Sequence, residues 1–159
     1  MAKIYLMCGK LCSGKSTRAE QLRREHRAVL LSVDEITLAL FGQDAGENHD
    51  TYVERAEDYL YKKSLEILEV GIDVVMDRGF WTKAERDFAR EFYGSRGISW
   101  EFVFIDISDE EWDRRIDKRN SDTEAGRIDA YYVDEGLRRK FDGIFQRPGD
   151  DEIMSSERS

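Results

Sequence analysis

Residues Gly9–Thr17 read GKLCSGKST, which matches the pattern G-x-x-x-x-G-K-[ST] of phosphate-binding (Walker A) loops. Its glycines let the backbone turn tightly and aim several N–H groups at one point, Lys15 can reach the β- and γ-phosphates, and the Ser16 hydroxyl can ligate Mg²⁺. The apolar run 3–8 predicts a buried strand before the loop, and 16–25 predicts a helix after it, whose dipole favours a phosphate. A chance glycine-rich turn would not need this context. The sequence therefore predicts an ATP·Mg²⁺ site built from Gly9, Cys12, Ser13, Gly14, Lys15, Ser16 and Thr17.

The composition indicates one globular domain, residues 1–159, with enough apolar side chains for a core, since they make up 40% of the chain. The formal net charge of −9 argues against a long nucleic-acid footprint, because such surfaces are usually basic, although a local basic groove stays open. The two cysteines offer neither a zinc pattern nor a disulfide framework.

The chain runs from its first residues straight into the first predicted strand, and no apolar run approaches membrane length. We therefore expect a cytoplasmic protein without a membrane partner. The sequence leaves open whether it is a monomer or a homodimer.

Strand-like and helix-like runs alternate along the chain, which is typical of an α/β fold with helices on both faces of a parallel sheet. The predicted strands are 3–8, 28–33, 72–76 and 101–106, with a short fifth near 152–154. In such sheets ligands bind beyond the carboxyl ends of the strands. The phosphate-binding loop follows the first of these strands.

Two aspartates end two of the other predicted strands. Asp77 fits a Walker-B-like acid that holds Mg²⁺ opposite Ser16, although it could merely cap a turn. Asp34 could accept the proton of an acceptor hydroxyl, or it could simply cap a helix over 35–41. If the sheet is as predicted, both carboxylates lie on the edge that carries the phosphate-binding loop.

A basic cluster occupies the stretch that we expect to form a lid, at about 114–131. Arg115 and Arg119 are four residues apart and share a helix face, and the polar stretch 120–126 reads as a loop. These two arginines could stabilise charge on a phosphoryl group in transfer. The alternative is a solvated helix face balanced by neighbouring acids.

Weaker candidates for acceptor binding are Arg55, Arg78 and Trp81. Arg86 could also bind an anionic acceptor. Ordinary surface exposure or core packing would explain each of them equally well.

The loop, the run 32–35, the run 75–81 (VMDRGFW) and the run 114–120 (RRIDKRN) together resemble AAA_33-type P-loop kinases. That group is similar to chloramphenicol phosphotransferase, zeta-toxin-like kinases and the polynucleotide kinase domain. The run 145–152 (FQRPGDDE) resembles the group's F-x-x-P-x-x-D-E segment.

The resemblance implies a P-loop NTPase fold, a three-layer α/β/α sandwich with a mainly five-stranded parallel sheet and a helical lid. It implies Asp34 as catalytic base, Arg119 as lid arginine, and Arg147 and Pro148 near the adenine. We therefore expect an ATP-dependent kinase acting on a hydroxyl of a small molecule. The alternatives are a polynucleotide 5′-hydroxyl kinase and a nucleotide-gated binding or regulatory protein with little turnover.

Overall fold

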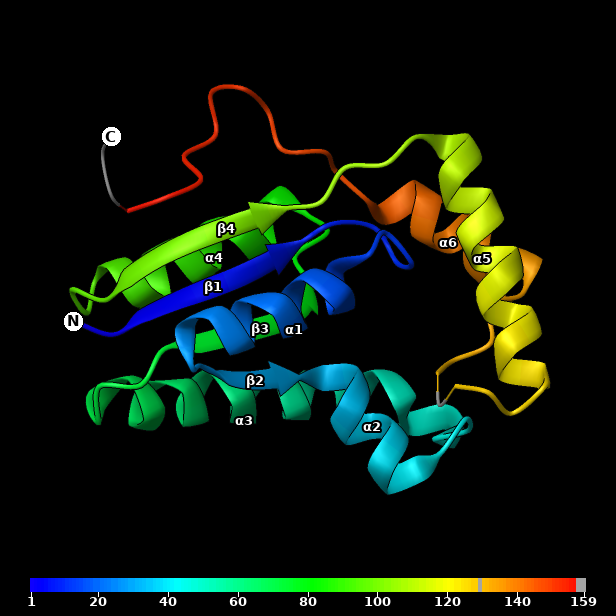
Figure 1. Cartoon of the computed structure of the whole chain (residues 1–159), viewed down its shortest axis with the longest axis horizontal. Coiled ribbons are helices and arrows are strands. Elements are labelled where there is room, and N and C mark those ends of the chain that lie inside the picture. Colours follow the sequence, from blue (N-terminus) through cyan, green and yellow to red (C-terminus); the bar gives the residue numbers. More distant parts are fainter. Residues whose placement is uncertain (129, 157–159) are drawn as a thin grey trace.

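The computed structural model describes residues 1–128 and 130–156, and it confirms an α/β fold around a parallel sheet. Figure 1 shows the strands side by side in the order β2-β3-β1-β4. Their bounds are β1 (Lys3–Cys8), β2 (Val29–Ser32), β3 (Val74–Gly79) and β4 (Ser99–Phe104). The two central strands, β1 and β3, are almost wholly buried, as expected when helices cover both faces of a parallel sheet.

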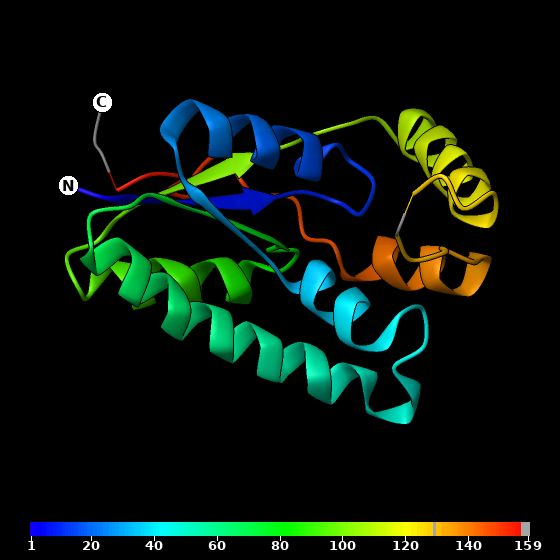
Figure 2. The same ribbon diagram turned by 60° about the horizontal axis from the view of Figure 1, so that its bottom comes forward.

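The helices form the two outer layers and a third group at the sheet's carboxyl edge. Figure 2 shows α1 on one face of the sheet and α3 with α4 on the other. The bounds are α1 (Lys15–His26), α2 (Val33–Phe41), α3 (His49–Glu69), α4 (Lys83–Gly94), α5 (Asp109–Glu124) and α6 (Glu135–Ile144), with a short 3₁₀ helix η1 (Gly46–Asn48).

Each face of the sheet has its own hydrophobic core, because successive side chains of a strand point to opposite faces. Tyr5 and Met7 of β1 pack toward Ala19 and Leu22 of α1. The alternate residues of β1 pack on the other face, in a larger cluster with buried residues of α3 and α4.

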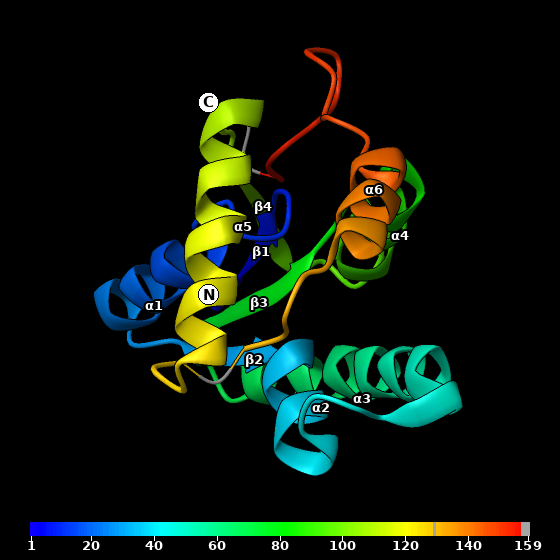
Figure 3. The same ribbon diagram turned by 90° about the vertical axis from the view of Figure 1, so that its right-hand side faces the viewer.

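A third core lies outside the sheet. Leu11 of the phosphate-binding loop packs with Trp112 and Ile116 of α5 and with Val133, which precedes α6. The indole N–H of Trp112 also donates to the Leu11 carbonyl at 2.6 Å. The loop and the two helices therefore share one hydrophobic cluster beyond the strand ends. Figure 3 shows α5 and α6 from this end of the molecule.

The strands differ from their predicted limits in a way that matters for the site. β3 was expected over 72–76 but runs from Val74 to Gly79, so Asp77 lies inside a strand and not after it. β4 starts and ends two residues earlier than the predicted 101–106, and β2 is shorter than the predicted 28–33.

The predicted fifth strand near 152–154 is not a parallel strand. This segment approaches β4 through an isolated antiparallel bridge between Glu101 and Ser155. The Phe102 N–H donates to the Met154 carbonyl at 2.7 Å, and the Ser156 N–H donates to the Trp100 carbonyl at 2.9 Å. The parallel sheet in the described residues thus has four strands, and the C-terminal segment covers its β4 edge in the opposite direction.

The stretch 120–126 was predicted to be a loop, but α5 continues through most of it and ends at Glu124. The Asp122 carboxylate, ion-paired with Lys118 and Arg127, supports this last turn. No helix among residues 1–128 and 130–156 has the length and apolar character needed to cross a bilayer.

Candidate functional site

A cleft of about 960 Å³ opens at the carboxyl edge of the sheet, between the phosphate-binding loop, α2 and α5. Its size suits a nucleotide together with a small second ligand. Its lining residues are Leu11, Cys12, Gly14, Lys15, Ser16, Thr17, Leu30, Ser32, Asp34, Glu35, Leu38, Ala39, Asp77, Glu111, Arg115, Lys118, Arg119, Asp122, Ile128 and Ala130.

The phosphate-binding loop takes a conformation that depends on its glycines. Gly14 has φ +97°, in the left-handed region, and it leads directly into α1, as an anion-binding helix N-terminus requires. A Cβ on Gly9 would lie 2.8 Å from the Ile105 carbonyl oxygen. The Lys15 ammonium donates to the Lys10 carbonyl at 3.3 Å, so it lies across the loop where a phosphate would bind. This arrangement fits the nucleotide predicted from the sequence.

The predicted metal pair is in contact. The Ser16 hydroxyl donates to the Asp77 carboxylate at 3.0 Å, and β3 positions Asp77 directly beside β1 and β2. Within the described parts of the chain, no group of three or more His, Cys, Asp or Glu side chains could hold a metal by itself. One hydroxyl and one carboxylate fit Mg²⁺ as kinases bind it, with phosphate oxygens and water completing the shell.

Asp34 lies in the first turn of α2 and faces the cleft. The alternative that it caps this helix is wrong, because the cap is Ser32, whose hydroxyl accepts from the Glu35 N–H at 3.2 Å. Solvent in the open cleft reaches Asp34, yet protein atoms of the cleft walls surround it. The resulting desolvation raises the pKa of this carboxyl, while the charges of Lys15 and Arg119 act in the opposite direction.

The two predicted lid arginines already touch the phosphate-binding loop. Arg115 donates to the Ser13 carbonyl at 2.9 Å and to the Glu111 carboxylate at 2.8 Å. Arg119 donates to the Cys12 sulfur at 3.1 Å, and its Nε is buried with no hydrogen-bond partner in the described residues. Both guanidinium groups therefore reach the place where phosphates would bind.

Three residues predicted to contact an acceptor do not line the cleft. Arg78 forms ion pairs with Glu57 at 2.7 Å and Glu85 at 3.5 Å, on the α3–α4 side of the sheet. Arg55 is an exposed residue of α3.

Trp81, the third of these residues, connects the phosphate-binding loop to α6. Its indole N–H donates to the Gly9 carbonyl at 3.1 Å, and its ring packs edge-on against Phe141 at 4.7 Å between centroids. No pattern in the sequence signals this contact, because residues 72 positions apart meet only in the folded protein.

Arg147 and Pro148 lie after α6 and outside the cleft lining. Arg147 pairs with Asp106 and lies over the Phe104 ring at 5.8 Å. Arg147 thus lies beside the segment that follows β4.

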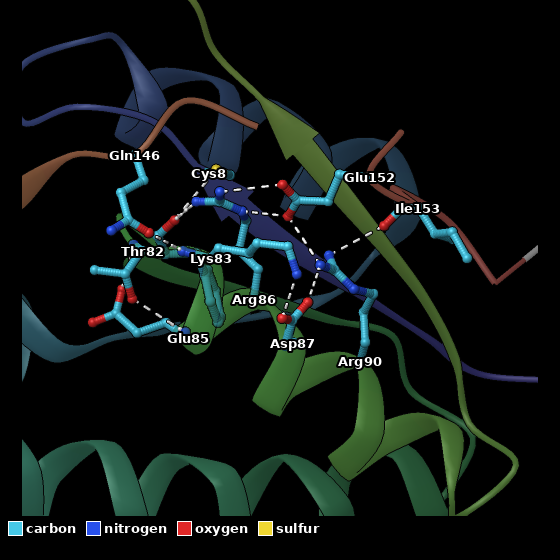
Figure 4. A network of polar contacts seen from close by, with 11 residues as sticks. Cys8, Thr82, Lys83, Glu85, Arg86, Asp87, Arg90, Gln146, Glu152 and Ile153 are labelled. Atoms are coloured by element: carbon cyan, nitrogen blue, oxygen red, sulfur yellow. Dashed lines mark hydrogen bonds and ion pairs between the residues drawn. The ribbon is translucent and has the colours of Figure 1, made fainter. Parts of the chain in front are cut away.

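Arg86 is a buried structural residue and does not face the cleft. Figure 4 shows Arg86 and Arg90 of α4 converging on Glu152, with Arg86 Nε at 2.5 Å and Arg90 at 2.9 Å from one carboxylate oxygen. Arg86 also donates to the Phe80 carbonyl at 2.9 Å. Burial opposes ionisation of Glu152, but these hydrogen bonds hold its pKa below the ordinary value. The only sequence signal for this cluster was Glu152 in the run 145–152.

Solved structures share this fold. A chain of the Pnkp1/Rnl/Hen1 RNA repair complex superposes with a TM-score of 0.72 at 23% identity, over 88% of this chain and 42% of that one. This chain thus spans less than half of that larger protein. The APS kinase of Mycobacterium tuberculosis, in complex with AMPPNP and APS, gives 0.65 at 21% identity, over 94% and 84%.

A gluconokinase from Sinorhizobium meliloti gives a TM-score of 0.61 at 17% identity, over 94% of this chain and 78% of that one. At these identities the likeness shows the fold alone. A search of curated proteins found no significant match. The sequence model of the AAA_33 family, described as an AAA domain, matches residues 4–139, which is most of the chain. This protein therefore belongs to the AAA_33 family of AAA domains.

Proposed function

We propose that the protein is an ATP-dependent kinase that moves the γ-phosphate of ATP to a hydroxyl of a small-molecule acceptor. The observation that carries the proposal is the convergence on one cleft of a phosphate-binding loop, the Ser16–Asp77 pair, Asp34 and two arginines. A protein that only bound nucleotide would need the first two of these features but not the others.

The phosphate side of the cleft binds and positions the donor. Backbone N–H groups of the loop and the Lys15 ammonium hold the β- and γ-phosphates, and Ser16 with Asp77 holds Mg²⁺. The ion neutralises charge on the phosphate oxygens when bound. Arg147 and Pro148 would lie toward the adenine.

The opposite side activates the acceptor. Asp34 accepts the proton of the attacking hydroxyl, and α2 fixes its position relative to the loop. Arg119 and Arg115 are carried by a lid of about 114–131 and stabilise the charge of the phosphoryl group in the transition state of its transfer. Closure of the lid excludes water from the site.

The test is acceptor-stimulated ATP consumption with Mg²⁺, comparing wild type with Asp34→Asn. We expect kcat to fall by about 10²–10⁴-fold in the variant, with little change in ATP affinity. Asp58→Asn, on an exposed position of α3, is the matched control. Collapse of ATP binding in Asp34→Asn would show that Asp34 is structural, and ATP binding without stimulated turnover would favour a nucleotide-gated binding protein.

The pH dependence gives a second readout. A base must be deprotonated to act, and the pKa of Asp34 is raised, so the acid limb of the kcat/KM profile should lie above the ordinary aspartate range. An acid limb at or below that range would contradict the assignment.

A further inference from the structure

The cleft has two walls of opposite character. Its basic lining residues are Lys15 of the loop and Arg115, Lys118 and Arg119 of α5, so all of them belong to the nucleotide side. Two of these also face neighbouring acids: Arg115 is 2.8 Å from Glu111, and Lys118 is 3.6 Å from Asp122. The positive charge of the cleft is therefore concentrated where ATP would lie.

The wall around Asp34 holds no lysine or arginine among the described lining residues. Helix α2 contributes the carboxylates of Asp34 and Glu35 and the apolar side chains of Leu38 and Ala39, and Ile128 lies on the cleft as well. Ile128 is 42% exposed, so an apolar side chain of this wall remains available to a ligand.

The arginines that could have served an anionic acceptor are committed elsewhere. Arg78 pairs with Glu57 and Glu85, Arg86 pairs with Glu152, and Arg55 is an exposed residue of α3 away from the cleft lining. None of the three lines the cleft.

An anionic group next to Asp34 and Glu35 would be repelled by both carboxylates, and the cations whose charges reach Asp34, Lys15 and Arg119, are those that the phosphates of ATP would engage. A cationic or uncharged group faces no such cost there, and an apolar portion gains by contact with Leu38, Ala39 and Ile128.

We propose that the acceptor is an uncharged or cationic alcohol with an apolar portion, and that the site discriminates against alcohols that carry a phosphate or carboxylate. The inference rests on the proposed kinase function. It excludes a 5′-hydroxyl polynucleotide as the preferred acceptor, since the phosphates of that ligand would have to lie along this wall.

The test compares matched alcohols that differ in charge: adenosine with adenosine 5′-monophosphate, glucosamine with gluconate, and pantothenol with pantothenate, together with a 5′-hydroxyl oligonucleotide. ADP formation gives kcat/KM for each, and calorimetry measures Mg·ATP binding separately. We expect stimulation by at least one uncharged or cationic member, at least tenfold above its anionic partner. Faster turnover of an anionic member or of the oligonucleotide, or no stimulation by any compound, would overturn the inference.

Calorimetry separates the two claims. If Mg·ATP does not bind, the proposed function fails, and the acceptor inference fails with it. If Mg·ATP binds and an anionic alcohol is the better acceptor, only the acceptor inference fails.

A charge substitution on the wall sharpens the test. Ala39→Arg places a cation at an exposed position of α2. It should reduce the ratio of kcat/KM between uncharged and anionic alcohols by about tenfold without lowering thermal stability. Val70→Arg, at the exposed residue that follows the C-terminal end of α3, is the control and should leave the preference between acceptors unchanged. An unchanged preference in Ala39→Arg would count against an acceptor bound at this wall.

Discussion

Two arginine clusters in this molecule use the same side chain in opposite ways. Beside α4, Arg86 and Glu152 have side chains only 1% and 4% exposed, and the Arg86 guanidinium donates to the Glu152 carboxylate and to the Phe80 carbonyl. In the cleft, Arg119 donates a hydrogen bond to the Cys12 thiol, and its buried Nε has no hydrogen-bond partner among the described residues.

The difference indicates what each cluster does. A fully paired buried arginine fixes the position of the segments that it joins, here α4 and the C-terminal segment. An underpaired arginine beside a phosphate-binding loop retains hydrogen-bonding capacity for a ligand. Arg78 and Arg138 also have a buried Nε without a partner, but both pair with carboxylates through other nitrogens, so they belong with the structural group.

The largest expected effect on the cleft comes from Lys15→Ala. Loss of the ammonium that reaches the phosphates should lower ATP turnover by about 10³-fold or more, with no loss of thermal stability, because Lys15 makes a single long hydrogen bond within the part of the chain that the structure describes. Steady-state kinetics and a melting curve check both parts. Lys62→Ala, at an exposed position of α3, is the control. A marked fall in melting temperature for Lys15→Ala would show that the basic groups of the cleft stabilise the fold, as the Arg86–Glu152 cluster does.

Arg119→Ala should lower kcat by about 10²–10³-fold and change ATP affinity much less, since its charge is needed most in the transition state. Removing this positive charge should also raise the pKa of Asp34 and move the acid limb of the rate profile upward. Arg139→Ala, an 80% exposed residue of α6, is the control. Equal losses in kcat and ATP affinity would argue against a transition-state role.

Glu152→Gln addresses the structural cluster. We expect a loss of about 3 kcal/mol in the free energy of unfolding, because the buried guanidinium of Arg86 and the half-buried one of Arg90 lose this carboxylate, with kcat little changed in the folded protein. Denaturant unfolding at neutral pH measures the loss. A large fall in kcat without a change in stability would reverse the assignment of this cluster.

The pH dependence of the stability of Glu152→Gln tests whether the carboxylate charge is the source of the stabilisation. The pKa of Glu152 is lower in the folded protein than its ordinary value of 4.5, so its stabilisation is present above that pH and is lost as pH falls through the folded-state pKa. The stability difference between wild type and Glu152→Gln should therefore shrink below about pH 4.5. A difference that stays constant through this range would mean that the carboxylate charge is not its source.

The smallest expected effect is at the junction between the proposed lid and α2. Tyr131 donates to the Thr37 hydroxyl at 2.7 Å, and that hydroxyl donates to the Asp34 carbonyl at 3.3 Å. Tyr131→Phe removes a hydrogen bond worth about 1 kcal/mol, which sets an upper limit of roughly fivefold on the expected fall in kcat. Tyr132→Phe, at the exposed neighbouring residue, should have no effect. Equal rates for both variants would show that the lid segment does not help to position Asp34.

Part of the site could be predicted because its residues sit at fixed places relative to local motifs. The loop Gly9–Thr17 specifies its own conformation through glycine, and the carboxyl ends of parallel strands meet at one edge, which brought Asp34 and Asp77 to it. The four-residue spacing of Arg115 and Arg119 put both on the face of α5 that meets the loop.

The sequence alone therefore determined the family, the α/β fold, the phosphate-binding loop and the acidic and basic groups around it, because each depends on local spacing and on the rules of parallel sheets. Only the tertiary structure decided which arginines are committed to carboxylates, that Trp81 supports Gly9, and that the C-terminal segment lies antiparallel to β4. These outcomes depend on contacts between residues far apart in the chain, whose pairing is set by packing and desolvation and leaves no periodic signal in the sequence.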